Sequence, residues 1–220
     1  MTTPSLRQPV KDTDRQENFN ETLTALVLAA LALTWFLALR GLTPGPLAWV
    51  VLRVTGIVSY AALAVATSLG ALIASRLAPA WLNRAVQYGW HGLLAGFALS
   101  AGAVHGLFLA VDSRFAQPVW RLLVPGATTF NPVWVGLGTA GLYALALVFA
   151  STALKGRLSR KAWKTLHLFS YPAFAALTLH GLMSGSDHLT GLYVVSTLAV
   201  AVTFTARITE ELARRGTAEA

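Results

Sequence analysis

The 220-residue sequence contains no cysteine. That absence excludes disulfide bonds, iron–sulfur clusters held by cysteine, and covalent haem attachment through a C-x-x-C-H motif. Any haem bound by this chain would therefore be held non-covalently.

Charged residues are also scarce. They make up 12% of the chain, against 55% hydrophobic residues, and the mean hydropathy is +0.58. Soluble domains carry about 25% charged residues, so this composition indicates an integral membrane protein in a lipid bilayer. The net charge of +8 would suggest nucleic acid in a soluble protein. Because no basic groove with interleaved aromatic residues accompanies it, we expect no nucleic-acid partner.

The nine acidic residues all lie outside the long apolar stretches. The sequence thus lacks an intramembrane carboxylate of the kind that relays protons or cations. This weighs against an ion-coupled transporter. A transporter or structural membrane protein whose histidines line a polar seam remains the third hypothesis, after the two that are stated at the end of this section.

Six apolar stretches are long enough, or nearly so, to cross a bilayer, which takes roughly 20 residues of helix. We therefore predict an all-α fold, an integral membrane six-helix bundle spanning residues 23–208. Residues 1–22 are expected to form a disordered cytoplasmic tail and residues 209–220 a short second tail. The predicted spans are 23–39, 48–75, 85–111, 133–154, 163–183 and 189–206.

The distribution of lysine and arginine predicts the orientation. Thirteen of these residues lie in one alternating set of segments, the two tails and the loops around 76–84 and 155–164, and four lie in the other set. Both termini are therefore expected in the cytoplasm, in a bacterial inner membrane. The third and fifth spans then run in the same direction, from inside to outside.

These two spans each carry a pair of histidines, His91 and His105 in the third, His167 and His180 in the fifth. Separations of 14 and 13 residues correspond to about 21 and 20 Å of helix rise, so the pairs match in depth. We interpret the four histidines as axial ligands of two stacked b-type haems held between the third and fifth helices. Zinc is a poor competitor, because ligands so far apart along a helix cannot share one ion.

The helical phase of the second pair is a difficulty. Fourteen residues at about 100° each return to nearly the same face, whereas thirteen do not. Pro172 lies between His167 and His180, and proline interrupts the helical hydrogen bonds. We expect a local change of winding there to bring both imidazoles inward.

Other residues carry weaker signals. Arg53 lies inside the outer end of the second span, where a charge is costly unless paired. We predict that it binds haem propionates, the alternative being an arginine that extends to the interface. Glycines in the third span flank its histidines and suit close approach of a helix or a macrocycle. These glycines are Gly89, Gly92, Gly96, Gly102 and Gly106.

His188 is expected to be a solvated loop residue.

The stretch from Gly136 to Gly141 matches the dinucleotide-binding pattern G-x-G-x-x-G. That pattern functions after a strand and at the start of a helix, with an acidic residue about 20 positions further on. Here it lies within an apolar span, and basic residues stand at the later position. We reject the dinucleotide interpretation.

The chain, with its paired histidines in apolar spans, resembles the ferric reductase-like transmembrane domain. This superfamily includes ferric reductases, NADPH oxidases and the haem membrane subunit of bacterial methionine sulfoxide reductase systems. The resemblance covers roughly residues 48–208. It rests on the paired histidines His91/His105, the segment Trp163-Lys-Thr-Leu-His167 with Tyr171, His180-Gly181, and Arg53-Val-Thr-Gly56.

The resemblance implies haem pairings His91–His167 and His105–His180, with electron transfer across the membrane. Many relatives continue into FAD- and NAD(P)H-binding domains. Because no such domain follows Arg207 here, we expect a separate donor, a flavoprotein or quinol. The leading hypothesis is an oxidoreductase, a dihaem cytochrome b that reduces an outer-face acceptor as ferric reductases do. The second is a haem-binding membrane anchor that delivers electrons to a periplasmic reductase such as a methionine sulfoxide reductase.

Overall fold

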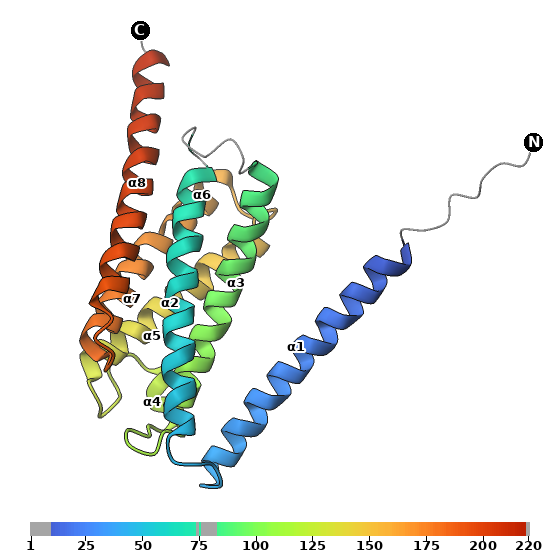
Figure 1. The fold of residues 1–220 in the computed structure, drawn as a ribbon. Coiled ribbons are helices and arrows are strands. Elements are labelled where there is room, and N and C mark those ends of the chain that lie inside the picture. The colour runs from blue at the N-terminus through green and yellow to red at the C-terminus, as the bar shows by residue number, and fades with distance from the viewer. Residues whose placement is uncertain (1–9, 74, 76–82, 219–220) are drawn as a thin grey trace, which may run out of the picture.

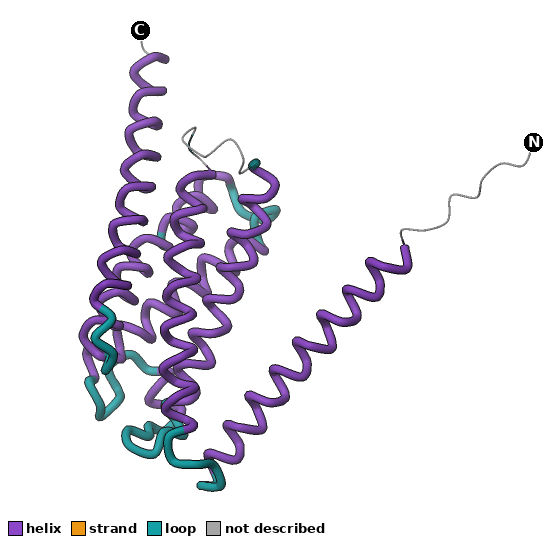
Figure 2. The backbone as a smooth tube through the Cα atoms, viewed as in Figure 1, coloured by secondary structure: helices purple, strands orange, loops and turns teal. Residues whose placement is uncertain are grey.

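The computed structural model describes residues 10–73, 75 and 83–218, and every regular element within these ranges is a helix. Figure 2 shows these helices joined by loops, with no strand in the part of the chain that is drawn in colour. The predicted all-α fold is confirmed for these residues.

Four helices in the described ranges are long and apolar enough to cross a membrane. They coincide, within a few residues at most ends, with the second, third, fourth and sixth predicted spans. The apolar part of the first helix, Ala25–Leu39, is shorter, and the fifth predicted span is divided into two helices, so the count of six spans stays a prediction. The four long helices are α2 (Leu47–Ile73), α3 (Arg84–Phe108), α5 (Pro132–Ala153) and α8 (Thr190–Ala218).

The bundle consists of two helix pairs (Figure 1). Helix α2 packs against α3, and α5 packs against α7 (Ser170–Ser184), while α8 lies along α2. The short helix α4 (Val119–Leu123) lies next to α5 at one end of the bundle. Because the two helices of each pair run antiparallel, residues early in α2 or α5 stand level with residues late in its partner.

Helix α1 (Val10–Leu39) projects away from this bundle in Figure 1. Its last turns make the contact, where Trp35 Nε1 donates a hydrogen bond of 2.9 Å to the carbonyl oxygen of Leu107. The helix begins within the predicted disordered tail, because no proline or glycine interrupts residues 10–39. Residues 1–9 of that tail lie outside the described residues. At the other end, α8 likewise continues to Ala218, through most of the predicted C-terminal tail.

Two clusters of buried apolar side chains hold the helices together, one near the α3–α4 loop and one around Tyr60 and Phe174 in the middle of the bundle. Many large apolar side chains nevertheless point outward, among them Val133 (68% exposed) and Val195 (67%). An outward-facing apolar surface is the arrangement that a lipid environment stabilises. The packing therefore supports the membrane location that composition predicts.

Two polar caps fix where the histidine-bearing helices begin. Asn83 Oδ1 accepts a hydrogen bond from the backbone of Val86 and begins α3, and Ser159 Oγ accepts one from Ala162 and begins α6 (Arg160–Leu168). Such caps satisfy amides that have no partner within the helix. His91 in α3 and His167 in α6 each follow the capping residue of their helix by eight residues.

The predicted fifth span is not one helix. It divides at Phe169 into α6 and α7, with Pro172 in the first turn of α7. Proline lacks an amide hydrogen and its ring clashes with the carbonyl four residues earlier, here that of Leu168, so it favours a helix start over a helix interior. The expected change of winding between His167 and His180 is present, three residues before the proline itself.

Candidate functional site

The structure brings the four helix-borne histidines together in two pairs. The ring centroids of His91 on α3 and His167 on α6 lie 5.9 Å apart, with an interplanar angle of 60°. Those of His105 on α3 and His180 on α7 lie 6.0 Å apart at 75°. We call these the inner pair and the outer pair, following the predicted orientation. They are the same pairs that depth matching predicts.

Three of the four imidazoles are hydrogen-bonded to the backbone of the helix beside them. His91 Nδ1 lies 2.8 Å from the carbonyl oxygen of Ala66, and His105 Nδ1 lies 2.7 Å from that of Leu52, both on α2. His180 Nδ1 lies 2.8 Å from the carbonyl oxygen of Trp134 on α5. A carbonyl oxygen only accepts, so Nδ1 carries the proton in each ring. The lone pair of the neutral ring is then on Nε2.

The same three imidazoles lie against glycines. A Cβ atom at Gly56 would stand 2.7 Å from Nδ1 of His105, and one at Gly70 would stand 2.9 Å from Cε1 of His91. A Cβ atom at Gly138 would stand 2.7 Å from Nδ1 of His180.

Each glycine follows the accepting carbonyl by four residues, as in Leu52 and Gly56, or Trp134 and Gly138. Residues four apart share one face of a helix, so each imidazole occupies a position formed by a carbonyl and the glycine one turn later. We call this arrangement a carbonyl–glycine cradle.

These three glycines were not predicted as partners of the histidines, which were associated with glycines of their own helix. Two of the latter, Gly96 and Gly102, do allow close approach of α5, where a Cβ would meet Phe149 and Leu142. A Cβ at the other three, Gly89, Gly92 and Gly106, meets nothing within 4 Å. A signal was nevertheless available. Gly56 and Gly70 are 14 residues apart, the separation of His91 and His105, as expected of partners on two antiparallel helices.

His167 is the exception among the four. Its Nδ1 is buried and finds no hydrogen-bond acceptor in the described part of the chain. The ring instead stacks on Trp163, one turn earlier in α6, with centroids 5.0 Å apart at 27°. Lys155 Nζ lies 4.5 Å from the centroid of the Trp163 ring, a cation–π contact.

Arg53 and Asp187 form an ion pair, in which Nε donates to Oδ2 at 2.7 Å. The Arg53 guanidinium also lies 5.4 Å from the Trp49 ring centroid. The carboxylate thus supplies the counter-charge for which we invoked haem propionates, and binding of propionates by Arg53 stays a prediction. His188 follows Asp187 in the loop before α8 and is exposed, as expected of a loop histidine.

The rejected G-x-G-x-x-G stretch has a packing role on α5. Gly136 lies against the backbone of Pro125 and Gly126, and Gly138 against His180. A Cβ atom at Gly141 would stand 2.8 Å from Cγ of Leu177 on α7. The pattern therefore reflects close approach of α5 to its neighbours, and it stands within a helix, where no phosphate-binding loop can form.

No group of three or more histidine or acidic side chains that could hold a metal ion occurs among the described residues. Each facing pair offers two nitrogen ligands, which is short of the four of a structural zinc site. Imidazole nitrogen binds metals at about 2.0–2.1 Å, so the ring centres of two imidazoles that share one ion in line would lie roughly 6.4 Å apart. The observed separations of 5.9 and 6.0 Å are shorter than this by about 0.5 Å.

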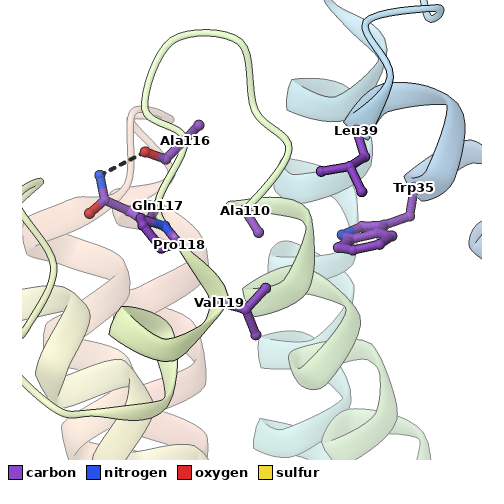
Figure 3. A pocket seen from close by; sticks show the side chains of 7 residues that line it. All are labelled: Trp35, Leu39, Ala110, Ala116, Gln117, Pro118 and Val119. Atoms are coloured by element: carbon purple, nitrogen blue, oxygen red, sulfur yellow. Dashed lines mark hydrogen bonds between the residues drawn. The ribbon is translucent and has the colours of Figure 1, made fainter.

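A hollow of about 390 Å³ lies away from these histidines, between the end of α1 and the loop before α4 (Figure 3). Its lining is mainly apolar, with Trp35 and Leu39 on one side and Pro118 and Val119 on the other. The polar group drawn there, Gln117, donates to the carbonyl of Ala116. The hollow contains no titratable side chain and adds none to the histidine site.

No family of known sequences, no curated protein and no solved structure matches this chain.

Proposed function

We propose that the chain is a transmembrane b-type cytochrome, in which the inner and outer pairs each hold one haem by bis-histidine ligation. The observation that carries this proposal is the outer pair. The ring centroids of His105 and His180 lie 6.0 Å apart in a T-shaped arrangement. Each ring has Nδ1 hydrogen-bonded to a backbone carbonyl, which leaves the lone pair on Nε2. No hydrogen bond to Nε2 of these rings occurs within the described residues.

This arrangement fits haem better than a bare metal ion. A metal-binding histidine typically donates its other nitrogen to a carbonyl or carboxylate, which fixes the tautomer and the ring orientation. In each pair the two histidines would each supply one nitrogen to a haem iron, whose remaining ligands belong to the haem itself. When bound, the haem supplies a one-electron iron couple, and the protein supplies orientation, low dielectric and tuning of the potential.

The chain's own residues define a path across the bilayer. The two pairs lie 14 and 13 residues apart along their helices, about 20 Å of helix rise, and so at two depths. The excess of lysine and arginine supports an orientation with both termini in the cytoplasm and the outer pair on the other side. We propose that electrons enter from a cytoplasmic-side flavoprotein or from quinol and leave at the outer face. A ferric chelate reduced directly, or a periplasmic reductase that binds this chain, is the acceptor.

The first test is a reduced-minus-oxidised absorbance spectrum of the detergent-purified protein, with haem and protein quantified on one sample. We expect two b-type haems per chain. One haem would restrict the proposal to one pair, and colourless protein after expression with haem supplied would overturn it.

Two alanine variants assign the haems. His180→Ala is expected to remove the outer haem, and external reduction with it, while sparing most of the inner haem. His188→Ala, in the exposed loop, is the matched control and should keep both. Reduction of free ferric chelates by the unmodified protein would identify direct reduction, whereas activity that needs an added outer-face reductase would identify the anchor role.

A further inference from the structure

The two histidine pairs are not equivalent. In the outer pair both imidazoles occupy carbonyl–glycine cradles, whereas in the inner pair only His91 does. His167 Nδ1 is buried without an acceptor. A hydrogen bond from the second ring nitrogen orients a ligating histidine and raises its basicity, and its loss typically weakens metal binding by about 10–100-fold.

The surroundings of His167 also restrain it little. Helix α6 has nine residues, none of them buried, and ends immediately after the histidine, at Leu168. The main ring contact is the stack on Trp163, which belongs to the same short helix. Rotation of His167 away from its partner therefore breaks no hydrogen bond of its ring and disturbs no core residue of α6.

We infer that His167 is an exchangeable iron ligand, and that the inner pair is a binding site for a small neutral ligand such as carbon monoxide, which the outer pair excludes. This inference rests on the proposed function. It also orders the two potentials, because a hydrogen-bonded, more basic imidazole favours the ferric state. The inner haem, with one such bond, should have the higher midpoint potential of the two.

The experiment disturbs the outer cradle and compares the result with wild type. Dithionite-reduced wild type and Gly138→Ser proteins are titrated with carbon monoxide, with haem per chain measured in each sample. Gly191→Ser is the matched control, because a Cβ at this α8 position meets nothing within 4 Å. The probe is carbon monoxide alone, read from its absorbance difference spectrum, so no electron-transfer assay is needed.

We expect one of the two wild-type haems to bind carbon monoxide, and the control to match it. Gly138→Ser should deplete the outer haem, because its side chain displaces His180 from the cradle. The haem that binds carbon monoxide should stay, which would assign it to the inner pair.

The inference is overturned if wild type keeps two haems that both bind carbon monoxide, or that both refuse it, or if Gly138→Ser removes the haem that binds carbon monoxide and keeps the other. Protein without haem would instead defeat the proposed cytochrome itself. The haem measurement on each sample separates these two failures.

Discussion

Gly138 and His180 make a contact that only a glycine allows, since a Cβ atom at position 138 would lie 2.7 Å from Nδ1 of the His180 imidazole. That contact keeps His180 Nδ1 within 2.8 Å of the Trp134 carbonyl, one turn earlier on the same helix. The orientation of a candidate ligand on α7 thus depends on the absence of a side chain on α5, a dependence that substitutions can test directly.

Gly138→Ala should displace the His180 ring from its acceptor. Glycine to alanine in a helix ordinarily stabilises by about 0.5–1 kcal/mol, whereas overpacking costs about 1–3 kcal/mol. We expect the second effect to dominate and the outer haem to be depleted, measured as haem per chain after purification. Gly191→Ala, on α8, is the control and should retain the full haem content. Equal haem content in both variants would show that His180 needs no cradle.

Gly56→Ala and Gly70→Ala should separate the two pairs. Gly56 faces His105 and Gly70 faces His91. Gly56→Ala is therefore expected to deplete the outer haem, and Gly70→Ala the inner one. Low-temperature difference spectra, compared with those of His105→Ala and His91→Ala, would assign each loss. Depletion of the same haem by both substitutions would contradict the pairing.

Arg53 and Asp187 should be energetically coupled. Their side chains are 38% and 20% exposed, and ion pairs at such partly solvated positions contribute no more than about 1 kcal/mol. A double-mutant cycle of Arg53→Ala and Asp187→Ala, followed by thermal denaturation in detergent, should return a coupling of that size. Loss of outer haem in Arg53→Ala but not in Asp187→Ala would instead support the predicted propionate role of the arginine.

Pro172→Ala should remove the obstacle that keeps α6 and α7 apart. Alanine restores an amide that can bond to the carbonyl four residues earlier, so the two helices can join. A continuous helix would turn His167 and His180 to different faces, because thirteen residues at about 100° each do not complete whole turns. We expect a lower content of one haem, with the helix content by circular dichroism unchanged or slightly higher. Full retention of both haems would show that packing alone enforces the break.

The absence of cysteine makes topology easy to test. Single cysteines at Ser186, in the loop before α8, and at Gly156, in the loop before α6, are both at exposed positions. In intact cells a membrane-impermeant maleimide should label Ser186→Cys and leave Gly156→Cys unlabelled until the cells are opened. The reverse pattern would invert the inner and outer pairs.

Long apolar runs predicted α2, α3, α5 and α8 within a few residues at most ends, because bilayer thickness fixes the length of such helices. Depth matching likewise predicted which histidines meet. The cradles were missed because every residue carries a carbonyl, so an acceptor leaves no mark in the sequence. The glycines considered were those next to the histidines along the chain, whereas the contacts run between helices. Asp187 was not foreseen as the partner of Arg53, since 134 residues separate them.

The cradles also bear on how the protein is made. His91 and His105 on α3 bond to carbonyls of α2, and His180 on α7 bonds to a carbonyl of α5. Each helix hairpin therefore contains both an imidazole and the group that orients it. The orientation of these three rings therefore requires no contact between the two hairpins, whereas the position of His167 depends on how the hairpins meet.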